Sequence, residues 1–200
     1  MPGREYHEAL WQGVPHGLQP PDFAVRSRFL LGHVTPGDRV LDVGCGEGRF
    51  AAELARAGAQ VVGIDVAEEP LRRARARHPE LDLRIVQGEG PWQLPDAGFE
   101  LVWAGEVIEH VADTARWLSE VRRVLDRNGR LLLTTPNHSR IHLALHGVQR
   151  YSHPLGDHLH LYSRASLTEV LGEFGFDTVT VRTAGGVPGL RRLLLARAAR

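Results

Sequence analysis

The chain has 200 residues, a length that suits one domain with a sizeable core. Its 24 Lys and Arg residues balance its 24 Asp and Glu residues, so the net charge disfavours nucleic acid or an anionic membrane as a partner. Cys45 is the single cysteine, which excludes an internal disulfide, and no apolar stretch reaches about 18 residues. We therefore expect a cytoplasmic protein with neither a signal peptide nor a membrane span.

The N-terminal segment, residues 1–36, mixes aromatic residues with Pro and Gly and predicts a cover over the domain. A short amphipathic helix is predicted inside it, over Phe23–Leu31. Tyr6 and Trp11 are candidates for a lid over a ligand, although aromatic residues near a terminus also pack on the surface of a core.

The remaining sequence alternates between short apolar runs and amphipathic segments. The first half predicts strands over Arg39–Val43, Gln60–Ile64, Leu83–Val86 and Glu100–Trp103, with helices over Phe50–Ala57 and from Pro70 to about Arg77. The second half predicts a helix capped by Asp113, a strand over Arg130–Thr135 after the turn Asn128-Gly129, a helix over Ala165–Phe174 and a strand over Phe176–Arg182. The last segment, Leu190–Ala199, fits a strand or a helix, and we favour the strand. This order indicates an α/β fold with a Rossmann-like, seven-stranded, mostly parallel sheet and helices on both faces.

The run Val40–Gly48 reads as a strand, a glycine-rich turn and a helix start, which lets the backbone approach a ligand closely. Arg49 stands where a dinucleotide-binding motif has its last glycine, which argues against a pyrophosphate site. Asp42 lies inside the strand end, where a buried carboxylate needs a partner such as a ligand ammonium. Asp65 ends the second strand and can accept hydrogen bonds from two ribose hydroxyls, and Glu89 can accept one from an adenine amine.

Together with Leu94–Val102 and Glu106–Val111, these motifs resemble the class I S-adenosylmethionine-dependent methyltransferases over roughly residues 39–182. The resemblance implies S-adenosyl-L-methionine as the cofactor, with the methionine part near Asp42 and the glycines. The cofactor-binding residues that it implies are Asp42, Gly44, Cys45, Gly46, Gly48 and Gly105, then Asp65 for the ribose, and Val66, Glu89 and Gly90 for the adenine. The family usually has Asp at the position of Glu89.

The segment after the fourth strand carries the candidate acceptor chemistry. If it opens a helix, Glu106, Glu109 and His110 share one face, which suggests a general base or a metal site. The segment resembles the ubiquinone-biosynthesis type of small-molecule O-methyltransferase, and also the RNA 3′-terminal ribose 2′-O-methyltransferases. The second resemblance implies a divalent metal (Mg²⁺, Mn²⁺ or Zn²⁺) held by Glu106, Glu109, His110 and His158. Alternatively, Glu109 and His110 only hold the loop by hydrogen bonds.

Histidines gather in residues 137–163, which we expect to form an acceptor-side insertion in a single methyltransferase domain spanning 1–200. His110 is the first candidate for a catalytic base and His158 the second, with His153 and His160 behind them. His138, His142 and His146 are spaced by four, which fits either a metal-binding face or a helix that covers the acceptor pocket.

The sequence therefore predicts a methyltransferase that acts on a small-molecule acceptor, most simply at a hydroxyl oxygen. Two alternatives stay open: a metal-dependent RNA 2′-O-methyltransferase and a small-molecule N-methyltransferase. A non-catalytic cofactor-binding protein and an NAD(P)-dependent oxidoreductase fit less well, because the cofactor motifs are intact and because Asp42 and Arg49 disfavour a dinucleotide. The identity of the acceptor and the oligomeric state are not predicted.

Overall fold

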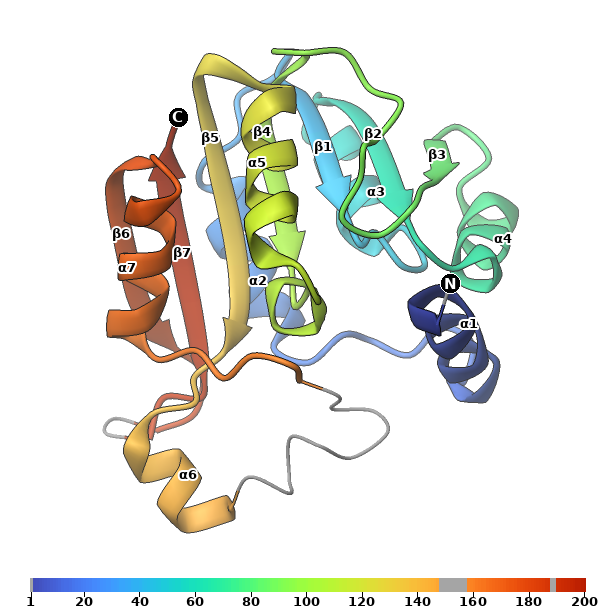
Figure 1. The fold of residues 1–200 in the computed structure, drawn as a ribbon. Helices are drawn as coiled ribbons and strands as arrows, with labels where there is room; N and C mark the ends of the chain where they lie inside the picture. The colour runs from blue at the N-terminus through green and yellow to red at the C-terminus, as the bar shows by residue number, and fades with distance from the viewer. Residues whose placement is uncertain (1, 148–157, 188–189) are drawn as a thin grey trace.

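A seven-stranded sheet organises the residues that the computed structural model describes, which are 2–147, 158–187 and 190–200 (Figure 1). Its strands are β1 (Arg39–Val43), β2 (Gln60–Asp65), β3 (Asp82–Ile85), β4 (Phe99–Gly105), β5 (Leu125–Pro136), β6 (Asp177–Ala184) and β7 (Leu193–Ala199). The strand order is β3-β2-β1-β4-β5-β7-β6, and only β7 runs antiparallel to its neighbours. The predicted α/β, Rossmann-like and mostly parallel sheet is confirmed.

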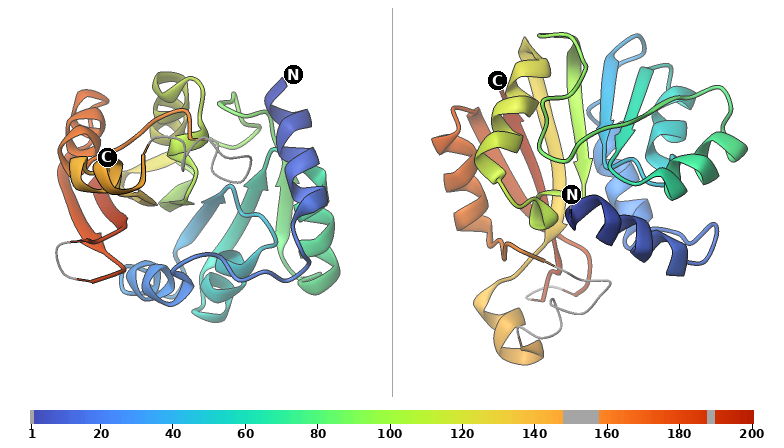
Figure 2. Two further views of the ribbon diagram at one scale, coloured as in Figure 1. Left: turned by 90° about the horizontal axis from the view of Figure 1, so that it is seen from below. Right: turned by 45° about the vertical axis from the view of Figure 1, so that its right-hand side comes forward.

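Helices cover both faces of the sheet. They are α1 (Pro2–Gly13), α2 (Phe23–Leu31), α3 (Arg49–Arg56), α4 (Glu68–Arg77), α5 (Thr114–Val124), α6 (Arg140–His146) and α7 (Arg164–Glu173), with a 3₁₀ turn η1 (Ile108–His110). Helices α5 and α7 lie on one face, and α2 and α3 lie on the other (Figures 1 and 2). Helices α1 and α6 lie beyond the carboxyl ends of the parallel strands, where open α/β sheets bind their ligands (Figure 1).

The central strands are apolar because helices cover them on both faces of the sheet. Leu131 and Leu133 of β5 pack with Trp117 of α5 on one face of the sheet. Leu132, the residue between them, points to the other face and packs with Leu30 of α2. Because both faces of β5 are covered, three consecutive leucines are fully buried, as expected for a strand inside a parallel sheet.

Strand β5 begins earlier than predicted. It follows α5 directly at Leu125, and its register with β4 shifts between the pairs Phe99–Leu125 and Leu101–Arg130. The Asn128-Gly129 pair lies within this irregular stretch rather than at a turn between helix and strand, so that prediction was wrong. The residues of the last predicted strand do form β7, from Leu193 onward. No helix in the described part of the chain is long and apolar enough to cross a membrane.

The packing of β5 gives a direct test of the core. We expect Leu132→Ala to lower the free energy of unfolding by about 2–5 kcal/mol, because it leaves a cavity between the sheet and α2. Leu18→Ala is the matched control, since the Leu18 side chain is exposed, and its effect should stay within about 0.5 kcal/mol. Chemical denaturation of the two variants measures both values, and equal effects would contradict the packing described here.

Candidate functional site

The glycine-rich turn after β1 lies at the switch point of the sheet, where β1 is flanked by β2 and β4. Gly44 and Gly46 have φ angles of 68° and 53°, which favour glycine. A Cβ atom on Gly44 would lie 2.6 Å from Cγ2 of Val107, so glycine also makes room for the segment after β4. Gly48 ends the turn and precedes α3, and Cys45, a residue of the same turn, is buried.

Asp42 is a buried carboxyl group with an incomplete set of partners. It is 1% exposed, and its Oδ2 atom has no hydrogen-bond partner among the residues that the structure describes. Burial raises the pKa of Asp42 to about 8, and the neighbouring carboxyl of Asp65 adds to this effect, whereas Arg26 opposes it. An unsatisfied buried carboxyl is costly, so this position favours a cationic ligand group.

Asp65 at the end of β2 lies beside the same turn. Its Oδ2 accepts a hydrogen bond from the N–H of Gly46 at 2.9 Å, and its Oδ1 accepts one from Ala67 at 3.0 Å. Burial raises the pKa of this carboxyl as well. Each oxygen has a second lone pair, so the side chain keeps capacity to accept from ligand hydroxyls. Val66, the next residue, is partly buried.

The loop between β3 and β4 places the residues predicted at the adenine edge. Oε1 of Glu89 accepts hydrogen bonds from the backbone N–H groups of Ala112 and Asp113, at 3.0 and 3.4 Å. Gly90 packs against Glu120 of α5, since a Cβ atom there would lie 2.9 Å from Cγ of Glu120. The Glu89 carboxyl therefore links this loop to the start of α5, and one of its oxygens is already engaged.

Arg26 is a site residue that the sequence reasoning missed. It lies on α2, is 3% exposed, and its guanidinium lies 4.8 Å from the ring centre of Phe50. Burial lowers the pKa of Arg26, while the charges of Glu106, Glu109 and Asp42 counteract that effect. Its Nε atom has no hydrogen-bond partner in the described ranges. Its position in the sequence, one helical turn before the fully buried Leu30, could have indicated that Arg26 faces the core.

Gly105 at the end of β4 packs directly against the Arg26 guanidinium, with no room for a Cβ atom. The absence of a side chain at Gly105 therefore lets Arg26 reach the carboxyl ends of the central strands. This contact gives Gly105 a packing role in addition to the cofactor-binding role that the resemblance implies.

The expected helical face after β4 does not form, which corrects the sequence interpretation. Glu106 has a positive φ of 61° and lies outside η1, which is only three residues long. Its carboxyl is near Arg26, and burial raises the pKa of Glu106 while Arg26 lowers it. Glu106 therefore does not share a helix face with Glu109 and His110, because the chain turns sharply between them.

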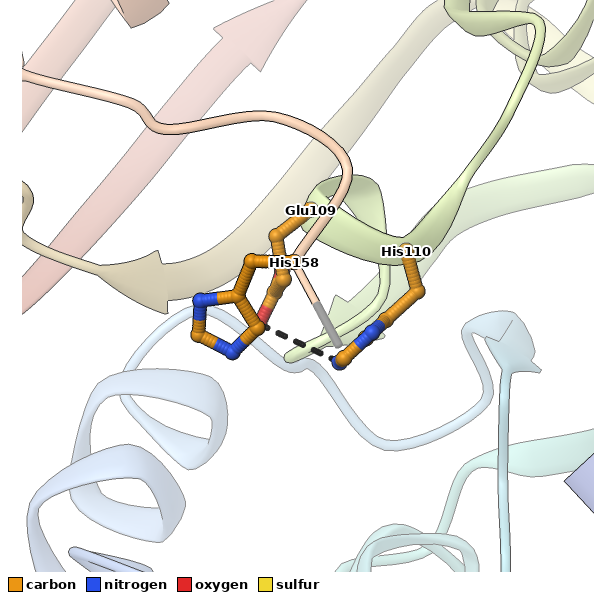
Figure 3. A group of neighbouring side chains, drawn as sticks. All are labelled: Glu109, His110 and His158. Carbon is orange, nitrogen blue, oxygen red and sulfur yellow. Dashed lines mark ion pairs between the residues drawn. The ribbon is translucent and has the colours of Figure 1, made fainter. Parts of the chain in front are cut away.

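Glu109, His110 and His158 do come together. Their potential ligand atoms lie within 4.8 Å of one another, and Figure 3 shows the three side chains converging. Nε2 of His110 is 3.9 Å from Oε1 of Glu109, which is fully buried. Oε2 of Glu109 accepts a hydrogen bond from the Thr135 hydroxyl at 2.9 Å. Burial, and then the charge of Glu106, raise the pKa of Glu109 well above its usual range.

The segment around His158 is fixed to this cluster by backbone contacts. The carbonyl oxygen of Glu109 accepts hydrogen bonds from the N–H groups of Leu159 and His160, at 2.8 and 3.1 Å. His138, at 3% exposure, lies behind His158 with a nitrogen-to-nitrogen distance of 2.9 Å. Sequence reasoning treated these two histidines separately, because 20 residues separate them.

The other candidate histidines do not join the cluster in the described part of the chain. His142 instead lies 2.8 Å from the Ser139 hydroxyl at the start of α6, and its ring is 6.3 Å from that of His146. His153 lies outside the described residues, as do residues 148–157 of the predicted insertion.

Helix α1 covers the glycine-rich turn. A Cβ atom on Gly46 would lie 3.1 Å from the Trp11 ring, and the His7 ring lies 6.3 Å from that of His110. The buried Arg73 of α4 holds the end of α1 by donating to the carbonyl oxygens of Trp11 and Val14, both at 2.8 Å. These contacts support the lid position proposed for Trp11, whereas Tyr6 contacts His7 of its own helix.

Comparisons with known proteins identify the family of the chain. A family profile described as a methyltransferase domain matches residues 20–181. The chain is 38% identical to a "probable S-adenosylmethionine-dependent methyltransferase" of Mycolicibacterium smegmatis, over 80% of this chain and 61% of the relative. It is 33% identical to a ubiquinone biosynthesis O-methyltransferase of Azorhizobium caulinodans, over 70% and 59%. It is 34% identical to the 27-O-demethylrifamycin SV methyltransferase of Amycolatopsis mediterranei, over 66% and 51%. The chain thus spans half to three fifths of the length of these relatives.

Solved structures share the fold. An S-adenosylmethionine-dependent methyltransferase of Methanosarcina mazei is 23% identical, with a TM-score of 0.69 over 86% of this chain and 96% of that chain. Phosphoethanolamine N-methyltransferase 2 of Haemonchus contortus, in complex with S-adenosyl-L-methionine, is 16% identical, with a TM-score of 0.75 over 100% of this chain and 57% of that chain. At these identities the comparison establishes the fold alone.

The pKa of Asp42 leads to a test of stability against pH. The native carboxyl holds its proton up to about pH 8, whereas the unfolded chain releases it near 3.8, so wild-type stability falls as the pH rises between these values. We expect the free energy of unfolding of Asp42→Asn not to show this loss. In the absence of ligand, its difference from wild type should therefore grow by roughly 2–4 kcal/mol between pH 5 and pH 9. Urea denaturation at several pH values measures the difference. The exposed Asp177→Asn is the matched control, and a constant difference for Asp42→Asn would contradict the burial argument.

Proposed function

The chain belongs to the methyltransferase domain family, and we propose that it uses S-adenosyl-L-methionine to methylate a hydroxyl oxygen of a small-molecule acceptor. The observation that carries this proposal is the buried Oδ2 atom of Asp42 at the glycine-rich turn, which has no hydrogen-bond partner among the described residues. A ligand ammonium at this position would satisfy the carboxyl and remove the cost of its burial. The cofactor carries such an ammonium, whereas a dinucleotide pyrophosphate would add further negative charge.

The residues around the turn fit the parts of this cofactor. Asp42 suits the ammonium and the buried guanidinium of Arg26 suits the carboxylate, since both charged groups lie by the ends of the central strands. Asp65 suits the ribose hydroxyls. We assign the methionine part to the backbone at Gly44, Cys45, Gly46, Gly48 and Gly105, and the adenine to Val66, Glu89 and Gly90.

The acceptor would bind on the side of Glu109 and His110. When bound, the cofactor would supply an electrophilic methyl group on a positively charged sulfur, which would keep the electron pair of its bond to that methyl group. His110 would remove the proton of the acceptor hydroxyl as the base, which leaves the oxygen lone pair for the new C–O bond. The imidazolium formed at His110 would lie close to the Glu109 carboxyl. Burial makes the ionised form of this carboxyl unfavourable unless a positive charge lies beside it. The pair therefore stabilises the charges that appear during transfer.

Hydroxyl oxygen is favoured over nitrogen by two considerations. A hydroxyl needs its proton removed, and the site offers an imidazole beside a buried carboxyl for that purpose. Two of the relatives named above are O-methyltransferases of small molecules. The small-molecule acceptor also fits the balanced charge of the chain.

Cofactor binding tests the first part of the proposal. We expect micromolar binding of S-adenosylhomocysteine by calorimetry, and at least a tenfold loss of affinity in Asp42→Asn, since an amide cannot pair with the ammonium as a carboxylate does. Asp65→Asn should weaken binding for the corresponding reason at the ribose. Asp177→Asn, exposed on β6, should bind like wild type. Absence of binding to the wild-type protein would refute the proposed function.

Methyl transfer tests the second part. We expect His110→Asn to lower kcat by about 10²–10⁴-fold for an accepted phenol or alcohol, with unchanged affinity for S-adenosylhomocysteine. His16→Gln is the control, because His16 is exposed. Wild-type activity should persist in EDTA. An assay of radiolabelled methyl transfer over a panel of phenols, alcohols and amines measures these effects, and full activity of His110→Asn would exclude the base role.

A further inference from the structure

His138 makes two hydrogen bonds that together define where its proton lies. Its Nδ1 atom lies 3.0 Å from the backbone N–H of Tyr162, and its Nε2 atom lies 2.9 Å from Nδ1 of His158. A backbone N–H can only donate, so Nδ1 of His138 must be an acceptor without a proton. A neutral imidazole carries one proton, which in His138 must therefore be on Nε2.

This proton determines the state of the next ring. The Nε2–H group of His138 donates to Nδ1 of His158, so the lone pair of that nitrogen is used. The proton of a neutral His158 must then be on its own Nε2 atom. Because each ring accepts a hydrogen bond at Nδ1, neither ring can carry the two protons of an imidazolium.

The surrounding backbone holds both rings in this arrangement. The N–H of His138 donates to the carbonyl oxygen of Tyr162 at 2.8 Å, which pairs the end of β5 with the segment that carries His158. The same segment is attached to η1 through Leu159 and the carbonyl of Glu109. Rotation of the His138 ring would leave the buried N–H of Tyr162 without its partner, which is unfavourable.

We propose that His138 is a positioning residue that fixes His158 in its Nε2–H tautomer, so that His158 donates a hydrogen bond to the acceptor oxygen. This role rests on the proposed function, whereas the tautomer itself does not. In this state His158 has no free lone pair to act as a base, which leaves the base role to His110. The donor would orient the hydroxyl while His110 removes its proton.

The same tautomer bears on the metal that the RNA methyltransferase resemblance implies. A metal ligand needs a nitrogen lone pair, and in His158 one nitrogen accepts from His138 while the other carries a proton. Glu106 is directed toward Arg26, outside the cluster. The set Glu109, His110 and His158 therefore does not fit a bound metal in the tautomeric state that the hydrogen bonds define.

Side-chain NMR tests the tautomer without cofactor or acceptor. Long-range ¹H–¹⁵N spectra of the ¹⁵N-labelled wild-type protein should show His158 protonated at Nε2 and unprotonated at Nδ1, with assignment from His158→Gln. The opposite tautomer of His158 in the wild-type protein would overturn the proposal. So would loss of the His158 signals on adding stoichiometric Zn²⁺, because that would mean that the ring is available as a ligand.

Two variants of His138 separate its role from general stability. His138→Gln keeps a donor near Nδ1 of His158, whereas His138→Asn keeps an acceptor for Tyr162 but is too short to reach His158. We expect His158 to keep its Nε2–H tautomer in His138→Gln and to show a mixture of both tautomers in His138→Asn. The affinity for Zn²⁺ should be about five-fold higher in His138→Asn than in His138→Gln. The same tautomer in both variants would overturn the role of His138.

Turnover separates this inference from the proposed function. His138→Asn should lower kcat with little change in KM, and His138→Gln should restore most of it, while both bind S-adenosylhomocysteine like wild type. If the tautomer is found as expected but S-adenosylhomocysteine does not bind, the proposed function fails and the tautomer stands. Equal kcat values for the two His138 variants would contradict the proposed role of His158 as a hydrogen-bond donor.

Discussion

The described site depends on buried carboxyl groups whose ionised forms the protein only partly stabilises. Asp42, Asp65 and Glu109 are all buried at the carboxyl ends of β1, β2 and β4, and burial raises the pKa of each. Arg26 reaches the same region as a buried cation, and its Nε atom has no hydrogen-bond partner in the part of the chain that the structure describes. Such an arrangement is unfavourable without a ligand and becomes favourable with a zwitterionic one, which explains why these groups are kept near the glycine-rich turn.

The order of the strands brings these groups together. Since β1 lies between β2 and β4, the ends of three parallel strands lie next to each other, and with them the sides that we propose for the cofactor and the acceptor. Helix α1 then covers the turn, with Trp11 on Gly46 and His7 near His110. Helix α1 is therefore close to both proposed sides of the site.

The sequence predicted the parts of this site that depend on local geometry. The positions of the glycines and of Asp65 at the strand ends were predictable because a strand followed by a tight turn has a recognisable pattern, whereas their role in cofactor binding stays a prediction. The contribution of Arg26 was missed because its partners, Gly105 and Glu106, are about 80 residues away and only the fold brings them close. The helical face at Glu106 was wrong because a positive φ there breaks the period that the spacing suggested.

Proton release on ligand binding reports whether the buried Asp42 carboxyl is neutral before the ligand binds and ionised afterwards. If the Asp42 carboxyl is neutral in the free protein and ionised beside an ammonium, binding of S-adenosylhomocysteine at pH 7 should release close to one proton. Calorimetry in two buffers that differ in ionisation enthalpy measures this number. We expect proton release from the wild-type protein and none from Asp42→Asn. Tight binding to the wild-type protein without proton release would contradict this expectation.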